Sequence, residues 1–410
     1  MTESFDVVIV GGGIAGAGLA TVLARGGLEV CVLERQTQYA DRVRGEWLAP
    51  WGVAEAQRAG LYDVLIDAGG HHVAKQVGYG DWVGPEVAEA SALPLDAVCP
   101  GIAGPVCLAH FTATEALAQS AAAAGASVVR GVGSVDPELG ASPHVSWTVE
   151  GTEHRASCRM IVGADGRVSA VRERAGINIR RVPERNHLAG LLVDDLEWPD
   201  DIQVIGAEGN LMFLVFPQAN GRGRLYLGLP NGERGRFSGP KGAANLLRAF
   251  ALDSLPGSER VVGATIAGPC AAYPGDDTWT NDPFADGVVL VGDAAGYSDP
   301  TIGQGLAIAM RDVRTVADVM LSGNDWTPAA FAFYATERAE RMRRLRISAE
   351  LIGRLHVIEG PNATVIRQRA FPKAMSDPNL LMVALAPIAG PDAPPAEAFD
   401  PALVDAAFAA

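Results

Sequence analysis

The chain has 410 residues, 48% of them hydrophobic, so it is long enough for two domains or one large composite fold with a substantial core. Its 48 acidic residues outnumber 33 basic ones and give a net charge of -15, which argues against nucleic acid or an anionic membrane as the main partner. Five scattered cysteines without a C-x-x-C pair indicate a reducing compartment. We find no basic leader, no membrane-length apolar run and no zinc-ligand spacing, so we expect a cytoplasmic protein that binds no metal.

The first predicted element is a strand over residues 7–10, whose apolar, β-branched side chains are typical of a parallel strand buried on both faces. Gly11, Gly13 and Gly16 follow in the spacing G-x-G-x-x-G, ahead of a helix predicted over residues 14–24. Gly11 permits the tight turn, Gly13 lets the backbone approach a pyrophosphate, and Gly16 lets helix and strand pack closely. Free N–H groups at the start of the helix would then face the phosphates.

A second apolar strand, residues 30–33, ends at Glu34. A carboxylate at the tip of this strand would accept hydrogen bonds from a ribose diol and repel a 2′-phosphate. The pattern therefore favours FAD or NAD over NADP as the dinucleotide.

The remaining elements predict an α/β protein with a Rossmann-like dinucleotide-binding domain, an inserted and mostly antiparallel β-sheet domain, and C-terminal helices. Helices are predicted at 53–68, 112–124, 243–255, 303–321 and 328–358. Strands are predicted at 127–132, 145–149, 155–160, 188–193, 203–205, 211–216, 224–229, 260–266 and 288–291. The expected division assigns residues 1–70, 100–176 and 267–345 to the dinucleotide-binding domain, 71–99 and 177–266 to the inserted sheet, and 346–410 to a helical cover or tail.

Two further glycine-and-acid segments accompany the first one: Gly163-Ala164-Asp165-Gly166 with Ser169 and Arg172, and Gly292-Asp293-Ala294-Ala295 with Pro300 and Gly303-Gln304-Gly305-Leu306. In this order, over residues 5–345, the chain resembles the single-component FAD-dependent aromatic hydroxylases of the para-hydroxybenzoate hydroxylase type. The resemblance implies FAD as cofactor, NADPH or NADH as transient reductant, and O2 and a small aromatic molecule as partners. The cofactor-binding residues it implies are Gly11, Gly13, Ile14, Ala15, Gly16, Glu34, Arg35, Arg44, His110, Asp165, Gly166, Gly292, Asp293, Pro300, Gly303, Gln304 and Gly305.

Elementary chemistry also supports a cofactor-binding role for the third segment, residues 292–306. The carboxylate of Asp293 follows a buried strand and could accept hydrogen bonds from a ribityl chain, although a plain helix cap is an alternative. Gly303, Gln304 and Gly305 begin a long helix whose positive end could stabilise an anionic reduced flavin. Pro300 restricts the backbone just before that turn.

The other cofactor-binding candidates also have plain structural explanations. Asp165 and Gly166 suit a simple βα turn as well as a cofactor site. Arg44 matches the arginine that holds the pyrophosphate in the family, whereas a lone arginine would be a surface charge. Two departures from the family are His110, where Arg or Gln is usual, and Ala307, where Asn is frequent.

The substrate site is expected between the loop of residues 292–305 and the antiparallel sheet. Candidate lining residues are Phe213, Phe216 and Tyr226, with Tyr297 or Asp299 as polar contacts, although core packing explains each equally well. No catalytic base stands out, and the candidates for a catalytic role are Pro300, Tyr297 and Asp299.

The leading functional hypothesis is a monooxygenase that oxygenates an aromatic or polycyclic molecule through a flavin C4a-hydroperoxide, as the resemblance implies. The alternatives are an FAD-dependent reductase or dehydrogenase, a monooxygenase fed by a separate reductase, and a non-catalytic flavin-binding regulator. Halogenation is disfavoured, because Met212, Leu214 and Phe216 stand where the Trp-x-Trp-x-Ile-Pro signature of the flavin halogenases would fall. We expect a monomer or homodimer.

Overall fold

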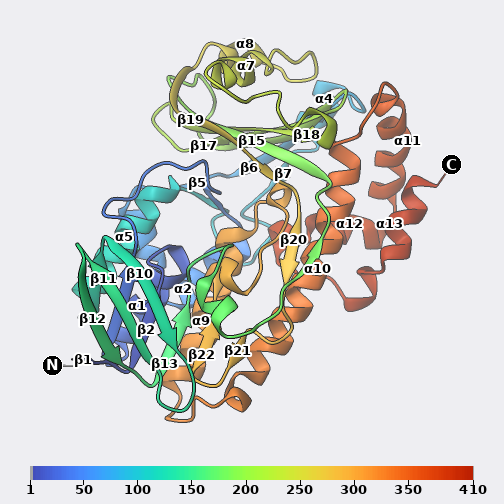
Figure 1. Ribbon diagram of the computed structural model, residues 1–410. Helices are drawn as coiled ribbons and strands as arrows, with labels where there is room; N and C mark the ends of the chain where they lie inside the picture. The colour runs from blue at the N-terminus through green and yellow to red at the C-terminus, as the bar shows by residue number, and fades with distance from the viewer. Residues whose placement is uncertain (1–2, 410) are drawn as a thin grey trace.

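A six-stranded sheet assembled from distant parts of the chain carries the first half of the architecture in the computed structural model, which describes residues 3–409 (Figure 1). Its strand order is β21-β22-β13-β2-β3-β9, parallel throughout except for the edge strand β21. The strands are β2 (Val7–Val10), β3 (Val30–Glu34), β9 (Ser127–Arg130), β13 (Met160–Gly163), β21 (Phe284–Ala285) and β22 (Val288–Leu290).

The two faces of this sheet are covered by different layers, because alternate side chains of a strand point to opposite faces. Val7 and Ile9 pack with the helices α1 (Ile14–Arg25), α5 (His110–Ala123) and α9 (Gly305–Leu321). Val8 and Val10 pack instead against a four-stranded sheet and a short helix. That second layer consists of β1 (Glu3–Ser4), β10 (Val132–Glu138), β11 (His144–Val149), β12 (Thr152–Ser157) and α6 (Ala170–Arg174).

A seven-stranded sheet of order β19-β15-β18-β17-β16-β6-β7 forms the upper half of Figure 1, with α7 and α8 on its outer face. All its pairs are antiparallel except β16 with β6. Its elements are β6 (Lys75–Gly80), α4 (Pro85–Ala90), β7 (Leu93–Pro94), β15 (Asn186–Asp194), β16 (Ile202–Glu208), β17 (Leu211–Pro217), β18 (Gly223–Pro230), α7 (Gly242–Arg248), α8 (Ser258–Val262) and β19 (Thr265–Pro274).

Short elements connect these layers. They are β4 (Trp47–Leu48), α2 (Pro50–Arg58), α3 (Tyr62–Asp67), β5 (His71–His72), β8 (Val106–Cys107), β14 (Arg180–Val182) and β20 (Asp277–Trp279). Five 3-10 turns are also present in the described residues: η1 (Asn231–Glu233), η2 (Gly292–Ala295), η3 (Pro300–Ile302), η4 (Pro328–Phe331) and η5 (Ala396–Ala398).

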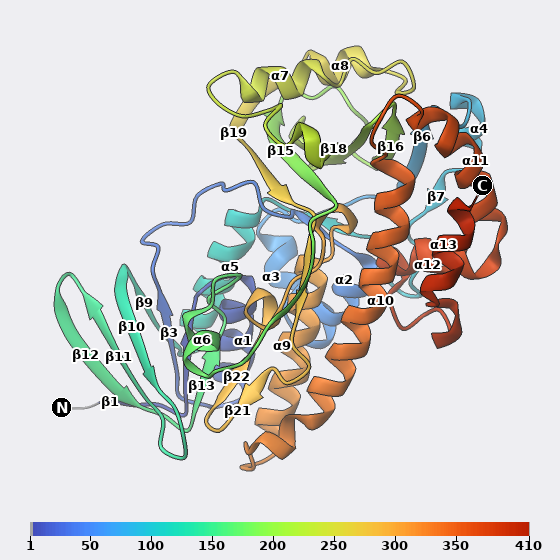
Figure 2. The same ribbon diagram turned by 45° about the vertical axis from the view of Figure 1, so that its right-hand side comes forward.

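The C-terminal part is helical, with α10 (Ala332–His356), α11 (Ala363–Ser376), α12 (Pro378–Ala389) and α13 (Pro401–Phe408). Figure 2 shows α10 running along one side of the molecule, from beside the six-stranded sheet up to the seven-stranded sheet, with α11, α12 and α13 on its outer side. Buried side chains such as Leu351, Leu355 and Val383 hold the four helices together in one apolar cluster.

The predicted fold class is confirmed, but several predicted elements are wrong in extent or type. The strand expected at 260–266 is instead α8 followed by β19, because Val261 is fully buried beneath the sheet as part of a helix that starts after Gly257 in a left-handed conformation. The helix expected at 243–255 ends at Arg248. The helix expected at 53–68 divides at Gly60, whose φ of +66° ends a helical turn.

Of the helices in residues 3–409, none combines the length and the apolar character that crossing a membrane requires.

Candidate functional site

The glycine turn between β2 and α1 lies at the carboxyl edge of the central strand. A Cβ atom at Gly11 would lie 2.4 Å from the Ala164 carbonyl oxygen, and one at Gly16 would lie 1.9 Å from the Gly11 carbonyl oxygen. A Cβ at Gly13 would meet no atom within 4 Å. Gly11 and Gly16 are therefore required by the packing of the chain on itself, whereas the space in front of Gly13 is open to a ligand.

Two helices present uncapped N-termini. The first turn of α1, with Ile14 and Ala15, follows Gly13, which has no side chain to cap it. The first turn of α9 begins at Gly305, and its N-cap residue Gln304 makes no capping hydrogen bond with its side chain. Each helix start thus offers free N–H groups and the positive end of a helix dipole to an anionic ligand.

Glu34 lies at the tip of β3, beside the glycine turn. Its Oε2 accepts a hydrogen bond from the Gly12 N–H (2.8 Å), and its Oε1 accepts one from the Gln36 N–H (2.7 Å). Because a carboxylate accepts about four hydrogen bonds, capacity remains for the hydroxyls of a ribose. The neighbouring Arg35 is exposed.

Asp165 stabilises the turn between β13 and α6, in keeping with the simple βα turn considered for it from the sequence. Its carboxylate accepts hydrogen bonds from the Ser169 hydroxyl (2.5 Å) and from the N–H groups of Ala170 (2.7 Å) and Val171 (3.2 Å). Burial raises the pKa of this carboxyl. Gly166 follows with a φ of +81°, which suits glycine in a tight turn.

Arg172 and Arg167 connect the glycine-and-acid segment of residues 163–166 with the one of residues 292–295. Arg172 Nη1 donates to the Ala294 carbonyl (2.8 Å), and its Nη2 donates to the Arg167 carbonyl (3.0 Å). The Arg167 guanidinium contacts Asp293 (3.4 Å). Segments more than 120 positions apart in the chain are therefore held at one edge of the six-stranded sheet.

A buried ion cluster that the sequence analysis did not identify supports the third segment. Asp312 Oδ2 accepts from the Gly292 N–H (2.8 Å), and Arg338 donates to the carbonyls of Gly292 (3.0 Å) and Gly296 (2.8 Å). Arg338 and Arg341 both contact the Asp312 carboxylate, and all three side chains are at most 1% exposed. The available signal was the i, i+3 spacing of Arg338 and Arg341 in the predicted helix of residues 328–358.

The turn of residues 299–304 precedes α9. The Asp299 carboxylate accepts from the Thr301 N–H (2.9 Å) and pairs with Arg185. Gln304 is buried, and its amide accepts from Trp51 Nε1 (2.9 Å) and donates to the Ile302 carbonyl (2.6 Å). Asp299 and Gln304 therefore shape this turn, and neither side chain lines the cavity beside it.

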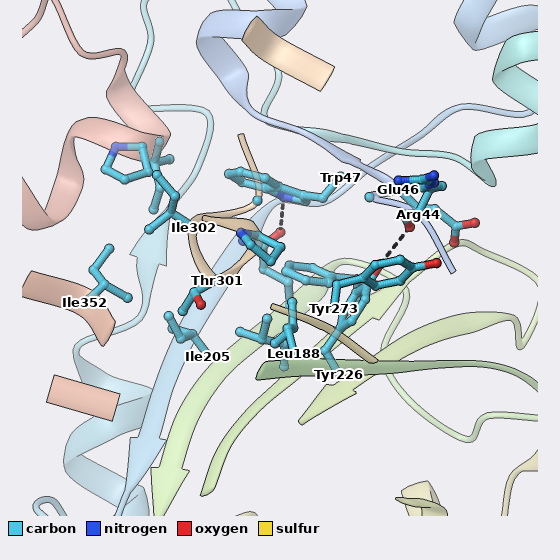
Figure 3. Close-up of a pocket in the computed structure, with 18 of the residues that line it drawn as sticks. Arg44, Glu46, Trp47, Leu188, Ile205, Tyr226, Tyr273, Thr301, Ile302 and Ile352 are labelled. Carbon is cyan, nitrogen blue, oxygen red and sulfur yellow. Dashed lines mark hydrogen bonds between the residues drawn. The ribbon is translucent and has the colours of Figure 1, made fainter. Parts of the chain in front are cut away.

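A cavity of about 140 Å³ lies between this turn, the loop of residues 43–47, the inner face of the seven-stranded sheet and α12 (Figure 3). In Figure 3, Arg44 and Glu46 lie at one end, and Ile302, Ile205 and Ile352 lie at the other. The lining residues are Val43, Arg44, Gly45, Glu46, Trp47, Gln76, Arg167, Leu188, Gln203, Ile205, Leu214, Phe216, Tyr226, Tyr273, Pro300, Thr301, Ile302, Gly303, Ile352, Ala384, Pro387 and Ile388.

Some of the substrate-site and catalytic candidates chosen from the sequence line this cavity, and others do not. Phe216, Tyr226 and Pro300 line it. Phe213 does not, because it points to the outer face of the sheet and packs beneath α7 and α8. Tyr297 does not line it either: its hydroxyl donates to Asp276 (2.9 Å), and the Arg167 guanidinium lies 4.2 Å from its ring centre.

Arg44 and His110 lie where the loop of residues 41–47 meets α5. The Arg44 guanidinium lines the cavity and lies 5.5 Å from the ring centre of Tyr273. Burial, with a smaller contribution from the charge of Arg44, lowers the pKa of His110 to about 4. The His110 imidazole is therefore neutral at pH 7, and the backbone N–H of His110 donates to Glu46 (3.1 Å).

A second buried ion cluster ties this loop to the sheet. Arg224, with no exposed side-chain surface, donates to Glu46 (2.8 and 2.9 Å) and to Asp41 (3.0 Å). Glu46 also accepts a hydrogen bond from Gln218, and Tyr226 donates to the Arg44 carbonyl (2.9 Å). These contacts position the backbone of Arg44 and Trp47 at the edge of the cavity.

The open glycine turn, the two uncapped helix ends and the adjoining apolar cavity together define a dinucleotide-binding oxidoreductase. The residues fit FAD, because Gly13 leaves room for a pyrophosphate and Glu34 retains acceptor capacity for a ribose.

Comparison with known proteins places the chain more closely. The model of the FAD binding domain family matches residues 4–346, and the chain belongs to that family. It is 26% identical over 339 residues to a menaquinone reductase of Mycolicibacterium smegmatis, covering 79% of this chain and 78% of the relative. It is 24% identical over 322 residues to squalene epoxidase 3 of Arabidopsis thaliana, covering 77% of this chain and 60% of the relative.

Among solved structures, p-nitrophenol 4-monooxygenase from Pseudomonas putida shares the fold, with a TM-score of 0.73 and 16% identity over 94% of this chain and 98% of that one. The family match confirms the predicted cofactor, FAD, and the predicted assignment to the FAD-dependent oxidoreductases.

Proposed function

We propose that this chain is a monooxygenase that uses NADH or NADPH and O2 to oxygenate a neutral, largely apolar aromatic or polycyclic molecule. The observation that carries the proposal is the cavity itself, whose apolar wall adjoins Pro300 and Gly303 directly before the uncapped start of α9. A flavin whose negatively polarised edge faced that helix end would lie against the same cavity as the substrate.

In this proposal the cofactor is held by backbone more than by side chains. Gly13 and the first N–H groups of α1 would bind the pyrophosphate, and Glu34 would bind the ribose. Arg44 and Asp293 would contact other polar parts of FAD, whereas Asp165 and Gln304 would act through the turns that they hold. When bound, FAD would accept a hydride from the nicotinamide and then activate O2.

The chain's own contribution to the reaction would be to position the substrate and to exclude water from the site. Trp47 and Phe216 stack at 6.1 Å between ring centres on the sheet side of the cavity, and Ile302 closes the turn side. An apolar wall of this kind excludes water from a reactive centre. We also propose that residues 1–70, 100–176 and 267–345 serve FAD, that 71–99 and 177–266 serve the substrate, and that 346–410 cover the site.

The test is to load the purified protein with FAD and to measure NADH and NADPH oxidation under air, with and without candidate phenols and polycyclic compounds. Incorporation of label from ¹⁸O2 into a product supports the proposal. If neither nucleotide reduces the flavin, the single-component form is excluded, and a separate reductase would have to be supplied.

The similarity to a menaquinone reductase favours a second candidate, an FAD-dependent reductase. A reduction of this kind adds two hydrogens to the substrate, incorporates no labelled oxygen and proceeds without O2. The mass of the product under anaerobic and aerobic conditions therefore separates the two candidates.

A further inference from the structure

A line of three hydrogen-bonding side chains crosses the sheet wall of the cavity. Trp47 Nε1 lies 2.8 Å from Gln203 Oε1, and Gln203 Nε2 lies 2.8 Å from Gln76 Oε1. Gln76 and Gln203 are direct partners in the parallel pairing of β6 with β16. All three residues line the cavity (Figure 3 labels Trp47).

Trp47 decides which group donates and which accepts in each hydrogen bond of this line. An indole N–H donates and never accepts, so the Gln203 oxygen must face Trp47 and its NH2 group must face Gln76. Gln76 therefore turns its oxygen to Gln203 and keeps its own NH2 group as a donor. That NH2 group donates to no other side chain or carbonyl in residues 3–409.

The other neutral polar groups around the cavity already have partners for their hydrogens. Tyr226 donates to the Arg44 carbonyl (2.9 Å), Tyr273 donates to the Arg42 carbonyl, and Thr301 donates to Asn186 (3.2 Å). The charged lining residues are Arg44, Glu46 and Arg167. Arg44 and Glu46 lie at the far end from Ile205 and Ile352 (Figure 3), and the Arg167 guanidinium contacts Asp293 (3.4 Å). The Gln76 amide is thus a neutral, free donor in a largely apolar wall.

We propose that Gln76 Nε2 recognises the substrate, and that the substrate carries an uncharged acceptor oxygen, a quinone or ketone carbonyl, on an otherwise apolar body. This inference rests on the proposed function in that it assigns the cavity to the substrate. A carbonyl satisfies the donor without the desolvation that an anion would require in this wall. A pure hydrocarbon of the same shape would leave the NH2 group without a partner.

The test uses two probes of similar shape, menadione (2-methyl-1,4-naphthoquinone) and 2-methylnaphthalene, which lacks the oxygens. Each is titrated into the FAD-loaded protein without nicotinamide, and binding is followed by the change in the visible absorption of the flavin. The variants are Gln76→Leu, which removes the donor, and Gln76→Glu, which keeps the shape and removes the NH2 group. Gln119→Leu, an exposed position on α5, is the matched control.

We expect the unmodified protein and Gln119→Leu to bind menadione about tenfold more tightly than 2-methylnaphthalene, since one neutral hydrogen bond is worth about that factor. Gln76→Leu should lose this preference while its affinity for 2-methylnaphthalene stays within about twofold. A preference that survives in both Gln76 variants, or that is absent from the unmodified protein, overturns the inference. Because no turnover is measured, the outcome is independent of whether labelled oxygen reaches a product.

Discussion

The glycine turn allows a prediction in which one substitution, Gly→Ala, has opposite consequences at two positions of the same motif. At Gly16 a Cβ would lie 1.9 Å from the Gly11 carbonyl oxygen, whereas ordinary contacts begin near 3.4 Å. Helix α1 would have to move from β2 by about 1.5 Å in a close-packed interior. We expect Gly16→Ala to cost about 3 kcal/mol of stability or more, the upper part of the range for overpacking.

Gly13→Ala should leave the protein folded. The backbone at Gly13 has a φ of -70° and a ψ of -171°, which alanine adopts freely, and its Cβ would meet no atom within 4 Å. The stability of the apoprotein should change by less than about 0.5 kcal/mol. The new methyl group would stand where the pyrophosphate approaches, so we expect FAD to bind roughly 5- to 150-fold more weakly, which corresponds to about 1–3 kcal/mol of steric cost.

The assays are urea unfolding of the apoproteins and titration of FAD followed by quenching of flavin fluorescence. Gly235→Ala, an exposed position with open space around its Cβ and an ordinary φ, is the control for the substitution itself. If Gly13→Ala bound FAD as tightly as Gly235→Ala, the cofactor would not lie against this turn, and the assignment of the site would be refuted.

Three further predictions follow from buried charges and from the cavity wall. Asp312→Ala leaves Arg338 and Arg341 buried without their carboxylate and should lower the free energy of unfolding by about 3–5 kcal/mol. The control Asp318→Ala, at an exposed position, should lower it by less than about 1 kcal/mol. Both are measured by urea unfolding, and equal effects would contradict the role assigned to the buried ion cluster. Burial, reinforced by the Asp299 carboxylate, raises the pKa of Asp277 from 3.8 to about 6. The folded state therefore holds the Asp277 proton more tightly than the unfolded state. The stabilisation from this proton is fully present below about pH 3.8 and is lost as the pH rises to 6. Asp277→Asn should therefore gain stability relative to the parent between pH 4 and 6, by up to about 3 kcal/mol, and a difference that stays constant over that interval would rule out the shifted pKa. Ala384→Phe places a ring in the cavity and should abolish the binding of menadione while FAD affinity stays within about twofold; unchanged menadione binding would place the substrate elsewhere.

The cavity wall contributed by α12 shows how tertiary packing adapts a segment for a site. Pro387 cannot donate a backbone hydrogen bond, so the Val383 carbonyl four residues earlier has no helical partner, and the Ser348 hydroxyl of α10 donates to it instead (2.8 Å). The Pro387 carbonyl in turn accepts from Trp51 Nε1 (3.2 Å). These contacts fix the face of α12 that carries Ala384 and Ile388 against the cavity.

The sequence by itself determined the features whose causes are local. The β2–α1 turn is specified by Gly11, whose φ of +101° suits glycine, and by Gly16, which packs against the Gly11 carbonyl, whereas Gly13 leaves open space in front of the turn. The α/β class follows equally from short β-branched runs and long amphipathic helices, and the resemblance to a flavoprotein family follows from three ordered motifs.

Only the tertiary structure decided which side chains face the cavity. The run from Leu211 to Phe216 is apolar on both faces, so alternation could not indicate that Phe216 points into the cavity and Phe213 away from it. Gln76 and Gln203 are 127 positions apart and meet only because β6 pairs with β16, and the wall at Ala384 comes from helices beyond the family match. Such contacts depend on the pairing of distant strands and helices, and no pattern within a single segment records that pairing.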